Sequence, residues 1–268
     1  MTRPETQAAC RGGAVQVLVL AGTRAGGDAL TEAEGVSSKA LIDIQGQPML
    51  SRVLRALRAS RASGPVTVMG LEGAELTAAA DGIACHALAA RGRGPASSLL
   101  CALEGDIAPP VLVTTCDHAL LTPEMVDVFL DGSEASGADL TVGLAERAVI
   151  EAGYPETRRT YLRLGGAELS GCNLFYIRTP HALEVLRFWQ SVEQDRKHPW
   201  RIARRFGLWT ALRILLARSG PEPVFAMLSR RLGAEVRPVF LPFAEAAIDV
   251  DKPGDLALVR GILAARAP

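Results

Sequence analysis

The stretch VQVLVLAG, residues 15–22, decides the fold class of this 268-residue sequence. A short run of mostly Val and Leu that ends in a small-residue loop is typical of a strand buried on both faces of a parallel sheet. Similar apolar runs follow at residues 66–69 and 110–115, and segments with helical periodicity separate them. Strands that alternate with helices predict βαβ units, and therefore an α/β fold with a mainly parallel sheet.

The other elements follow from periodicity and from turn residues. Strands are expected at 15–20, 66–69, 85–88, 110–115, 140–144, 160–164, 173–177 and 236–241. Helices are expected at 49–59, 75–80, 96–103, 123–130, 180–192, 200–216, 223–232 and 254–265. Residues 22–39 are expected to form a loop, and Thr122 is a candidate helix N-cap. Because no repeat or low-complexity linker is visible, we expect one domain over 14–268, with a helical embellishment at about 184–232 and disorder over 1–13.

Composition excludes several classes of protein. Apolar residues make up 49% and charged residues 22%, as in an ordered globular protein. The formal net charge is zero, so there is no global basic field for nucleic acid, and no nucleic-acid partner is expected. Residues 1–13 are too short and polar for a secretory signal, and no apolar run reaches the roughly 20 residues that span a bilayer. Five widely spaced cysteines without a C-x-x-C motif are typical of reduced thiols, which predicts a cytoplasmic protein.

Two neighbouring segments carry the clearest sign of chemistry. Residues 20–24, LAGTR, form a glycine loop directly after the first strand, and such a loop exposes backbone N–H groups to an anion. Lys39 can add a point charge for phosphate, and it heads a β-rich segment that leads into GQPML, residues 46–50, at the start of a helix. The glycine loop alone is also compatible with a plain turn. The lysine followed by a Gly-x-Pro-Met-Leu helix start is far more specific.

On these residues the chain resembles the GT-A-fold nucleotidyltransferases, particularly the molybdenum-cofactor guanylyltransferase-like (MobA-like) branch. The family pattern is L-A-G-G-x-x-x-R-M, then K-x-L-x-x-x-x-G-x-P-[ML]-[LI]. The matching residues are Leu20, Ala21, Gly22, Lys39, Leu41, Gly46, Pro48, Met49 and Leu50. Thr23 replaces the second glycine, Arg24 stands at a different offset from the family arginine, and the stretch before Lys39 is longer. The resemblance implies a Rossmann-like GT-A fold with a helical insertion.

The resemblance also assigns nucleotide-binding roles. The residues concerned are Leu20, Ala21, Gly22, Thr23, Arg24, Lys39, Gly94, Ser97 and Ser98. The segment GRGPASSLL, residues 92–100, is similar to a G-x-x-x-S-L segment that places a helix N-terminus beside the nucleobase and ribose. Ser97 and Ser98 either touch the base or cap that helix, and both interpretations stay open.

Three aspartates are expected to hold Mg²⁺. The segment TCDHALLTP is similar to C-D-x-P-x-[LV] of the family, and it puts Asp117 at the carboxyl end of a central strand, where open α/β sheets bind ligands. Mg²⁺ prefers carboxylate oxygens together with substrate phosphates. The segment AIDVDKPGDL is similar to [DN]-x-[DN]-T-P-x-D-L, and alternation puts Asp249 and Asp251 on one face. Asp249 is the expected second ligand and Asp251 the next, while Asp255 is expected to start a helix.

The resemblance implies an NTP-dependent nucleotidyltransferase with Lys39 and Asp117 as catalytic residues. It would move NMP from an NTP, with GTP or CTP favoured, to a phosphorylated small molecule or lipid-like acceptor and release pyrophosphate. Asn173 in GCNLF, residues 171–175, is the candidate acceptor-binding residue, although a strand-edge turn explains the same pattern. Two alternatives stay open: a GT-A glycosyltransferase that uses a nucleotide-sugar, and a nucleotide-binding module without catalysis, which Thr23 in place of the second glycine keeps open.

Residues 196–231 differ from the rest of the chain. They hold nine Lys and Arg residues and one acid, Glu222, although the whole chain has zero net charge. A local basic segment indicates an anionic partner near it. Three interpretations stay open: a helical subdomain packed on the core, a cover that binds the acceptor and, over 200–217, a helix in peripheral contact with an anionic membrane surface. We expect this segment chiefly to determine the acceptor.

Overall fold

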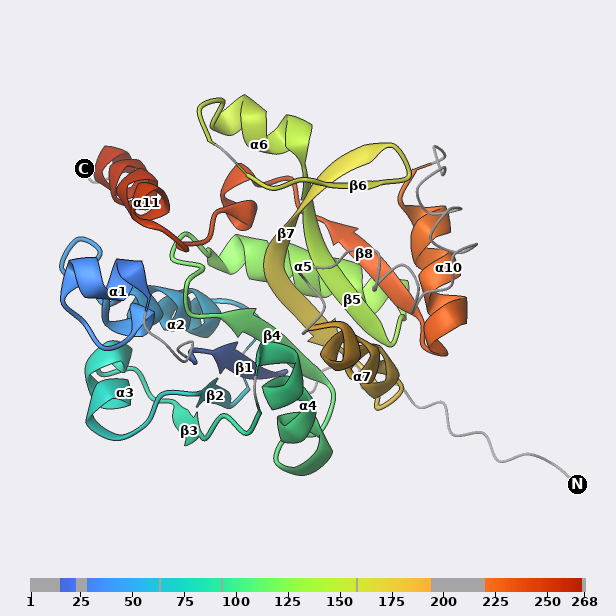
Figure 1. The fold of residues 1–268 in the computed structure, drawn as a ribbon, viewed down its shortest axis with the longest axis horizontal. Coiled ribbons are helices and arrows are strands. Elements are labelled where there is room, and N and C mark those ends of the chain that lie inside the picture. The colour runs from blue at the N-terminus through green and yellow to red at the C-terminus, as the bar shows by residue number, and fades with distance from the viewer. Residues whose placement is uncertain are drawn as a thin grey trace, which may run out of the picture.

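The structure is a computed structural model, and it describes residues 15–22, 28–62, 64–92, 94–157, 159–193 and 220–266. One eight-stranded sheet runs through the molecule, with helices on both of its faces (Figure 1). The strand order is β3-β2-β1-β4-β7-β5-β8, and β6 pairs with β7. The strands are β1 (Gln16–Leu20), β2 (Val66–Met69), β3 (His86–Leu88), β4 (Val111–Thr115), β5 (Leu140–Glu146), β6 (Leu162–Leu164), β7 (Ala167–Ile177) and β8 (Val236–Phe240).

Parallel pairing dominates the first half of the sheet. Val17 of β1 lies opposite Val66 of β2 on one side and Leu112 of β4 on the other. β2 and β3 are also parallel, as are β5 and β8. β7 runs antiparallel between β4 and β5. The predicted α/β fold with a mainly parallel central sheet is confirmed, and one long antiparallel strand joins its two parallel parts.

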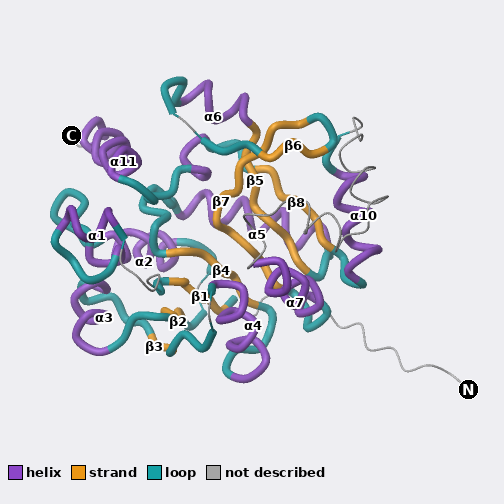
Figure 2. The backbone as a smooth tube through the Cα atoms, in the orientation of Figure 1, coloured by secondary structure: helices purple, strands orange, loops and turns teal. Residues whose placement is uncertain are grey.

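Two layers of helices sandwich the sheet (Figures 1 and 2). α2, α3 and α5 pack on one face, in a core cluster that includes Val17 and Phe129. α4, α7 and α10 pack on the other face, with Leu18 and Phe225. Val17 and Leu18 point to opposite faces and both are buried, as the apolar run of β1 predicts. The helices are α1 (Ala29–Glu34), α2 (Met49–Ala59), α3 (Gly73–Ala80), α4 (Pro95–Gly105), α5 (Pro123–Ser136), α6 (Arg147–Gly153), α7 (Ala182–Glu193), α10 (Glu222–Leu232) and α11 (Pro253–Arg266).

A third core cluster lies just beyond the carboxyl end of β4 and joins segments that are far apart in the chain. Ile42 and Ile44 meet Leu120, Ile248 and Val250 there, and all five are buried. The apolar side of α11 completes the cluster. Burial of this apolar surface fixes the segment after Lys39 and the segment around residue 249 against the end of β4. The cluster therefore forms the floor of the predicted site.

The loop expected at 22–39 contains a helix that the sequence did not reveal. Asp28 caps α1 by accepting a hydrogen bond from the Leu30 N–H at 3.0 Å, and Gly35 ends the helix with a φ of +66°. Six residues are too few to display helical periodicity, and the same holds for the seven residues of α6. Among the predicted helices, α5 continues to Ser136, six residues beyond its expected end, and Thr122 is its N-cap as predicted.

The predicted β-rich segment after Lys39 is wrong. Residues Lys39–Leu41 form a 3-10 turn, and the Ser38 hydroxyl caps it by accepting from the Ala40 N–H at 3.3 Å. A tight turn follows, in which Gly46 has a φ of +77°. The apolar side chains in this segment alternate because they point into the third core cluster, without any strand of the sheet being formed.

Several predicted features fall on residues outside the described part of the chain. These are residues 1–13, Thr23 and Arg24, and residues 194–219, which include the helix expected at 200–216 and the membrane contact proposed for 200–217. α7 and α10, which flank the last of these stretches, match the helices expected at 180–192 and 223–232. No helix among the described residues combines the length and apolar character that crossing a bilayer requires.

Candidate active site

Asp117 lies two residues beyond the end of β4, at the carboxyl edge that β4 shares with β1. Thr115 Oγ1 donates to Asp117 Oδ1 at 2.5 Å, and the Val250 N–H donates to the Asp117 main-chain oxygen at 3.0 Å. The pKa of Asp117 is raised to about 6, chiefly by burial; the Thr115 hydroxyl opposes the shift, and the charges of Asp249 and Asp251 add to it. The carboxylates predicted from two distant segments therefore come together.

Asp249 is held between a cation and an amide. Arg159 Nη1 donates to Asp249 Oδ1, and Arg159 Nη2 donates to the Asp249 main-chain oxygen at 3.2 Å. Asn173 Nδ2 donates to Asp249 Oδ2 at 3.3 Å. The Arg159 side chain is only 9% exposed, and it also lies 3.8 Å from Asp255 Oδ1. Both carboxylate oxygens of Asp249 are thus oriented by the protein.

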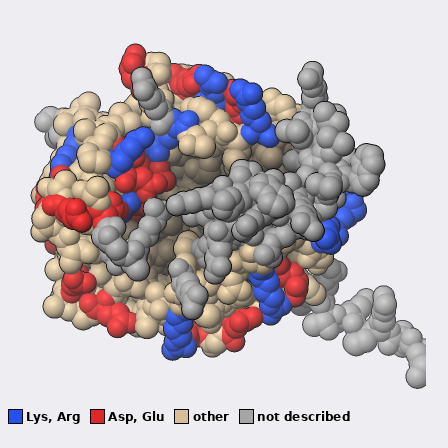
Figure 3. All heavy atoms as spheres, in the orientation of Figure 1, with Lys and Arg blue, Asp and Glu red and all other residues tan. Residues whose placement is uncertain are grey.

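Lys39 links this carboxylate group to the start of α1. Its Nζ lies 2.8 Å from Asp251 Oδ1 and 3.4 Å from Asp28 Oδ2, and it donates to the Val250 main-chain oxygen at 3.1 Å. Burial acts to lower the pKa of Lys39, but the carboxylates of Asp251, Asp117 and Asp28 raise it above its ordinary value, so the ammonium stays charged. Figure 3 shows acidic and basic side chains gathered beside a hollow on this face of the molecule.

A bulge in β7 aims Asn173 at the site. Val142 pairs with Phe175 and Leu144 with Gly171, so three residues of β7 lie opposite Gly143 alone. Asn173 takes a φ of +50°, a left-handed conformation that Asn adopts more readily than most residues. Bulges re-aim side chains next to active sites. The bulge brings Asn173 to the carboxylates, while its contact with an acceptor stays a prediction.

The glycine loop begins directly beside these carboxylates. Leu20 ends β1, and the Ala21 N–H donates to the Met69 main-chain oxygen at 2.8 Å. A Cβ at Gly22 would meet no described atom within 4 Å, whereas a Cβ at Gly70 would lie 2.7 Å from the Gly22 Cα. Within the described part of the chain, the backbone at Gly22 is therefore packed tightly against Gly70 and uncovered on the side where its own Cβ would lie. Binding of phosphate by Leu20, Ala21 and Gly22 stays a prediction.

The start of α4 is organised by its own cap. Gly94 is the N-cap, and its N–H donates to Ser97 Oγ at 2.9 Å while Ser97 Oγ donates back to the Gly94 oxygen at 2.9 Å. A Cβ at Gly92 would lie 2.7 Å from both Ser97 Oγ and the Ser98 nitrogen. Ser97 and Ser98 are buried. The cap interpretation therefore applies to Ser97, and a base contact by Ser98 stays a prediction.

Three residues of the site were not predicted as members of it. Asp28 has a local signal that could have found it, because an Asp before an apolar residue and a later Glu is typical of a helix start. Arg159 has no such signal, since it lies in the loop between α6 and β6 and reaches Asp249 only through the fold. His118 is buried beneath the site, and burial lowers its pKa to about 4, so its imidazole is neutral at neutral pH.

The carboxylates suit a magnesium ion that is held partly by its substrate. In the described ranges, no group of three or more His, Cys, Asp or Glu side chains is arranged to hold a metal. Mg²⁺ commonly takes one or two carboxylates and completes its shell with water and substrate phosphates. Asp117 and Asp249 supply two such carboxylates, and among the described residues the carboxylates around them outnumber the cations Lys39 and Arg159. The donor set therefore fits Mg²⁺ accompanied by a triphosphate.

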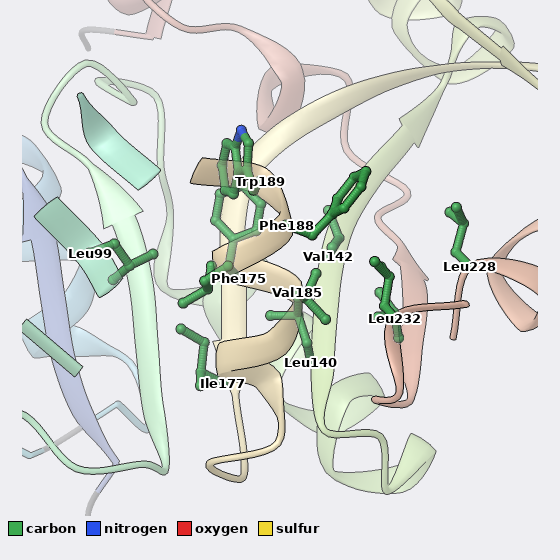
Figure 4. A pocket seen from close by; sticks show the side chains of 12 residues that line it. Leu99, Leu140, Val142, Phe175, Ile177, Val185, Phe188, Trp189, Leu228 and Leu232 are labelled. Atoms are coloured by element: carbon green, nitrogen blue, oxygen red, sulfur yellow. The ribbon is translucent and has the colours of Figure 1, made fainter. Parts of the chain in front are cut away.

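An apolar groove lies beside the site, on the face of the sheet that α4, α7 and α10 cover (Figure 4). Its volume is about 290 Å³. Phe175, two residues after Asn173, faces Trp189 of α7 with ring centres 5.8 Å apart. The lining consists of Leu99, Leu140, Val142, Phe175, Ile177, Val185, Leu186, Phe188, Trp189, Leu228, Leu232 and Val236. The sheet beyond Asn173 thus continues into an apolar surface.

Comparisons with known proteins identify the family and the fold. Residues 17–237 match the sequence pattern of a family described as the MobA-like NTP transferase domain. A hypothetical transferase from Thermus thermophilus is similar in structure, with 34% sequence identity and a TM-score of 0.76 over 90% of this chain and 99% of that one. Among curated proteins, none matches the sequence significantly.

Two more distant structures share the fold. A CMP:2-keto-3-deoxy-manno-octonic acid synthetase complexed with CTP has 17% identity and a TM-score of 0.57, over 94% of this chain and 100% of that one. A nucleotidyl transferase from Methanothermobacter has 14% identity and a TM-score of 0.55, over 96% of this chain and 100% of that one. At such low identity the likeness extends to the fold alone.

Proposed function

Because the chain belongs to the family of MobA-like NTP transferases, we propose that it is a Mg²⁺-dependent nucleotidyltransferase. It transfers a nucleoside monophosphate from an NTP to a phosphate-bearing acceptor and releases pyrophosphate. The observation that carries this proposal is the convergence of Lys39, Asp117 and Asp249 at one edge of the sheet, beside the glycine loop. A lysine next to that loop suits a triphosphate better than the diphosphate of a nucleotide-sugar.

The proposed reaction is an in-line displacement. An oxygen of the acceptor phosphate attacks the α-phosphorus, the bond to the oxygen that bridges to the β-phosphate breaks, and pyrophosphate leaves. Lys39 and the backbone after β1 hold the triphosphate in line for this attack. Asp117 and Asp249 hold the Mg²⁺, which when bound offsets negative charge on the phosphates. No side-chain nucleophile is required, because the acceptor itself attacks.

The nucleotide is expected to be GTP or CTP, and thermal shift with each of the four NTPs and Mg²⁺ measures the preference. A ligand present at about 100 times its Kd stabilises the native state by about 2.7 kcal/mol, which a melting curve resolves easily. The same series with EDTA is the control for the metal. Stabilisation by ATP or UTP alone would contradict the expected base preference.

Catalysis is separated from mere binding by isotope exchange. Labelled pyrophosphate is incubated with protein, Mg²⁺, the stabilising NTP and a panel of phosphorylated acceptors that ranges from sugar phosphates to prenyl phosphates. A nucleotidyltransferase transfers label into the NTP when its acceptor is present, because the reaction is reversible. A binding module shows saturable NTP binding with no exchange. A glycosyltransferase also shows no exchange, and it is recognised by a larger thermal shift with a nucleotide-sugar than with the NTP.

We also propose that the basic segment determines the acceptor. Removing residues 196–219 and joining the flanks with a glycine-serine linker is expected to leave the NTP thermal shift intact but to abolish transfer. The deletion stops before α10, because Val224 and Phe225 of that helix are buried in the core and their loss would unfold the protein. The Gly220 N–H donates to the Gly165 oxygen at 2.9 Å, which anchors the C-terminal flank.

A second variant keeps the full length and changes Arg201, Arg204 and Arg205 to Gln. If charge in this segment selects the acceptor, this variant raises the KM for the acceptor and leaves the NTP thermal shift unchanged. Transfer to the same acceptor by the deletion variant would show that the segment does not select it. Flotation of the full chain with anionic and with neutral liposomes tests the membrane interpretation.

A further inference from the structure

Arg159 contacts one of the expected metal ligands, Asp249, at two places. It comes from the loop between α6 and β6, and its side chain is only 9% exposed. Its two terminal nitrogens contact the Asp249 carboxylate and the Asp249 main-chain oxygen. We propose that Arg159 is a positioning residue: it fixes the Asp249 carboxylate so that Asp249 and Asp117 can share one divalent cation. This inference rests on the proposed function.

The geometry of these contacts fixes a rotamer and leaves room for a ligand. The Arg159 guanidinium contacts both the carboxylate and the main-chain oxygen of Asp249, so it fixes the Asp249 side chain relative to the Asp249 backbone. Asn173 Nδ2 donates to the second oxygen, Oδ2, at 3.3 Å. A carboxylate offers about four acceptor positions, so two protein donors leave the outward lone pairs available. The Asp249 carboxylate is therefore held in one orientation and keeps free acceptor positions for a cation.

The charges around Arg159 allow a cation to bind despite its positive charge. Arg159 also lies 3.8 Å from Asp255 Oδ1, and Asp255 Oδ2 accepts hydrogen bonds from the N–H groups of Asp251 and Lys252 at 3.2 and 3.1 Å. The guanidinium is therefore shared between two carboxylates. Asp249 and Asp251 lie close enough to Asp117 for their charges to raise its pKa. Among the residues that the structure describes here, five carboxylates, those of Asp28, Asp117, Asp249, Asp251 and Asp255, surround the two cations Lys39 and Arg159.

The planar fork of arginine is what this role requires. A lysine ammonium is a compact point charge and does not reproduce two parallel contacts from a rigid group. Residues that orient a metal ligand typically change metal affinity by about 10- to 100-fold when they are mutated. Loss of Arg159 should therefore appear in metal binding itself, in the absence of any substrate.

The test measures Mn²⁺ binding to the full-length, nucleotide-free protein by electron paramagnetic resonance, in which the signal of free Mn²⁺ falls as the ion binds. Arg159→Met keeps the apolar stem of the buried side chain and removes the fork, and it is expected to weaken binding by about 10- to 100-fold. Arg159→Lys keeps the charge and is expected to weaken binding as well. Arg163→Ala is the matched control, because the side chain of Arg163 is 81% exposed and pairs with Glu168.

Each result bears on the proposal. Unchanged or tighter Mn²⁺ binding in Arg159→Met overturns it, and tighter binding would identify Arg159 as a competing cation. Wild-type affinity in Arg159→Lys also overturns it, because charge alone would then suffice. If Arg159→Met does not fold, Arg159→Lys carries the test, with circular dichroism as the check on folding. If the wild type binds Mn²⁺ only when the stabilising NTP is present, the variants are compared with that NTP added. Absence of Mn²⁺ binding by the wild type both without and with the NTP defeats the metal site and the proposed function together, whereas wild-type affinity in both variants defeats this inference alone.

Discussion

Replacing Asp117 with asparagine is expected to lower the rate of nucleotidyl transfer by about 10²–10³-fold, the usual effect of losing one preorganised charge contact in an active site. Asparagine keeps the shape of the side chain and can still accept the hydrogen bond from Thr115 Oγ1. It cannot supply the negative charge that a metal ligand needs. Pyrophosphate release at saturating NTP and Mg²⁺ measures the effect.

The same substitution is expected to stabilise the metal-free protein. Burial and neighbouring carboxylates raise the pKa of Asp117 from its ordinary value near 3.8 to about 6. The folded state therefore binds this proton more tightly than the unfolded state, and stability falls as the pH rises from about 4 to about 6. A pKa difference of about two units between the folded and unfolded states changes the free energy of unfolding by about 3 kcal/mol. Above pH 6 in EDTA, Asp117→Asn should melt roughly 5 °C higher, and the advantage should vanish near pH 4.

Asp131→Asn serves as the control for Asp117→Asn, because Asp131 lies on α5 with its side chain 69% exposed and pairs with Arg61. It should change neither the rate nor the pH profile of stability. Near-normal transfer by Asp117→Asn would remove Asp117 from the catalytic machinery. A melting advantage without any pH dependence would assign the stabilisation to packing instead of to the lost charge.

Lys39→Met is expected to reduce kcat/KM for the NTP by about 10²–10³-fold. Methionine matches the length of the side chain but removes an ammonium that lies within 3.4 Å of two carboxylates and 3.1 Å of the Val250 oxygen. If Lys39 holds the triphosphate equally in the ground state and in the transition state, KM rises and kcat stays unchanged, whereas a contact that strengthens in the transition state lowers kcat. Steady-state kinetics over a range of NTP concentrations separates the two contributions.

Arg55→Met is the matched control for Lys39→Met, since it removes a positive charge from an exposed pair with Asp81 on the surface of α2. It should behave as the wild type. Lys39→Arg should restore little activity, because the larger guanidinium does not fit the compact contacts that the ammonium makes. Full activity of Lys39→Met would show that the role of Lys39 is structural, namely to link the N-cap of α1, Asp28, to Val250 and Asp251.

The parts of the fold that could be predicted from the sequence are the strands whose apolar runs indicate that they are buried. β1, β2 and β4 were found because strands buried on both faces are continuously apolar. β7 was predicted to begin at Asn173 but begins at Ala167, because its bulge interrupts the alternation on which a strand prediction depends. The antiparallel direction of β7 follows from long-range pairing, which no local pattern encodes.

The site could be predicted where a residue lies next to a recognisable element. Asp117 could be predicted as a site residue because it follows a buried strand, and Asp249 because it lies in a segment that resembles a family motif. The structure brings the two residues together. Arg159 could not be found, since its partner is 90 residues away and its own loop carries no pattern. Ser97 was found, but its hydroxyl is used by the helix cap, a choice that depends on atomic geometry.

The third core cluster has a consequence for the order in which a newly made chain can acquire its site. Asp117 and Asp249 are separated by about 130 residues, and the segment that carries Asp249 is held in place by Val250 and Ile248 in that cluster. At synthesis rates of about 5–20 residues per second, Asp249 emerges roughly 7–26 s after Asp117. The strands around the glycine loop are complete long before then. A nascent chain thus passes through a period in which the half with the glycine loop exists without Asp249, and the proposed transfer is expected to begin only once the last helix has completed the third core cluster.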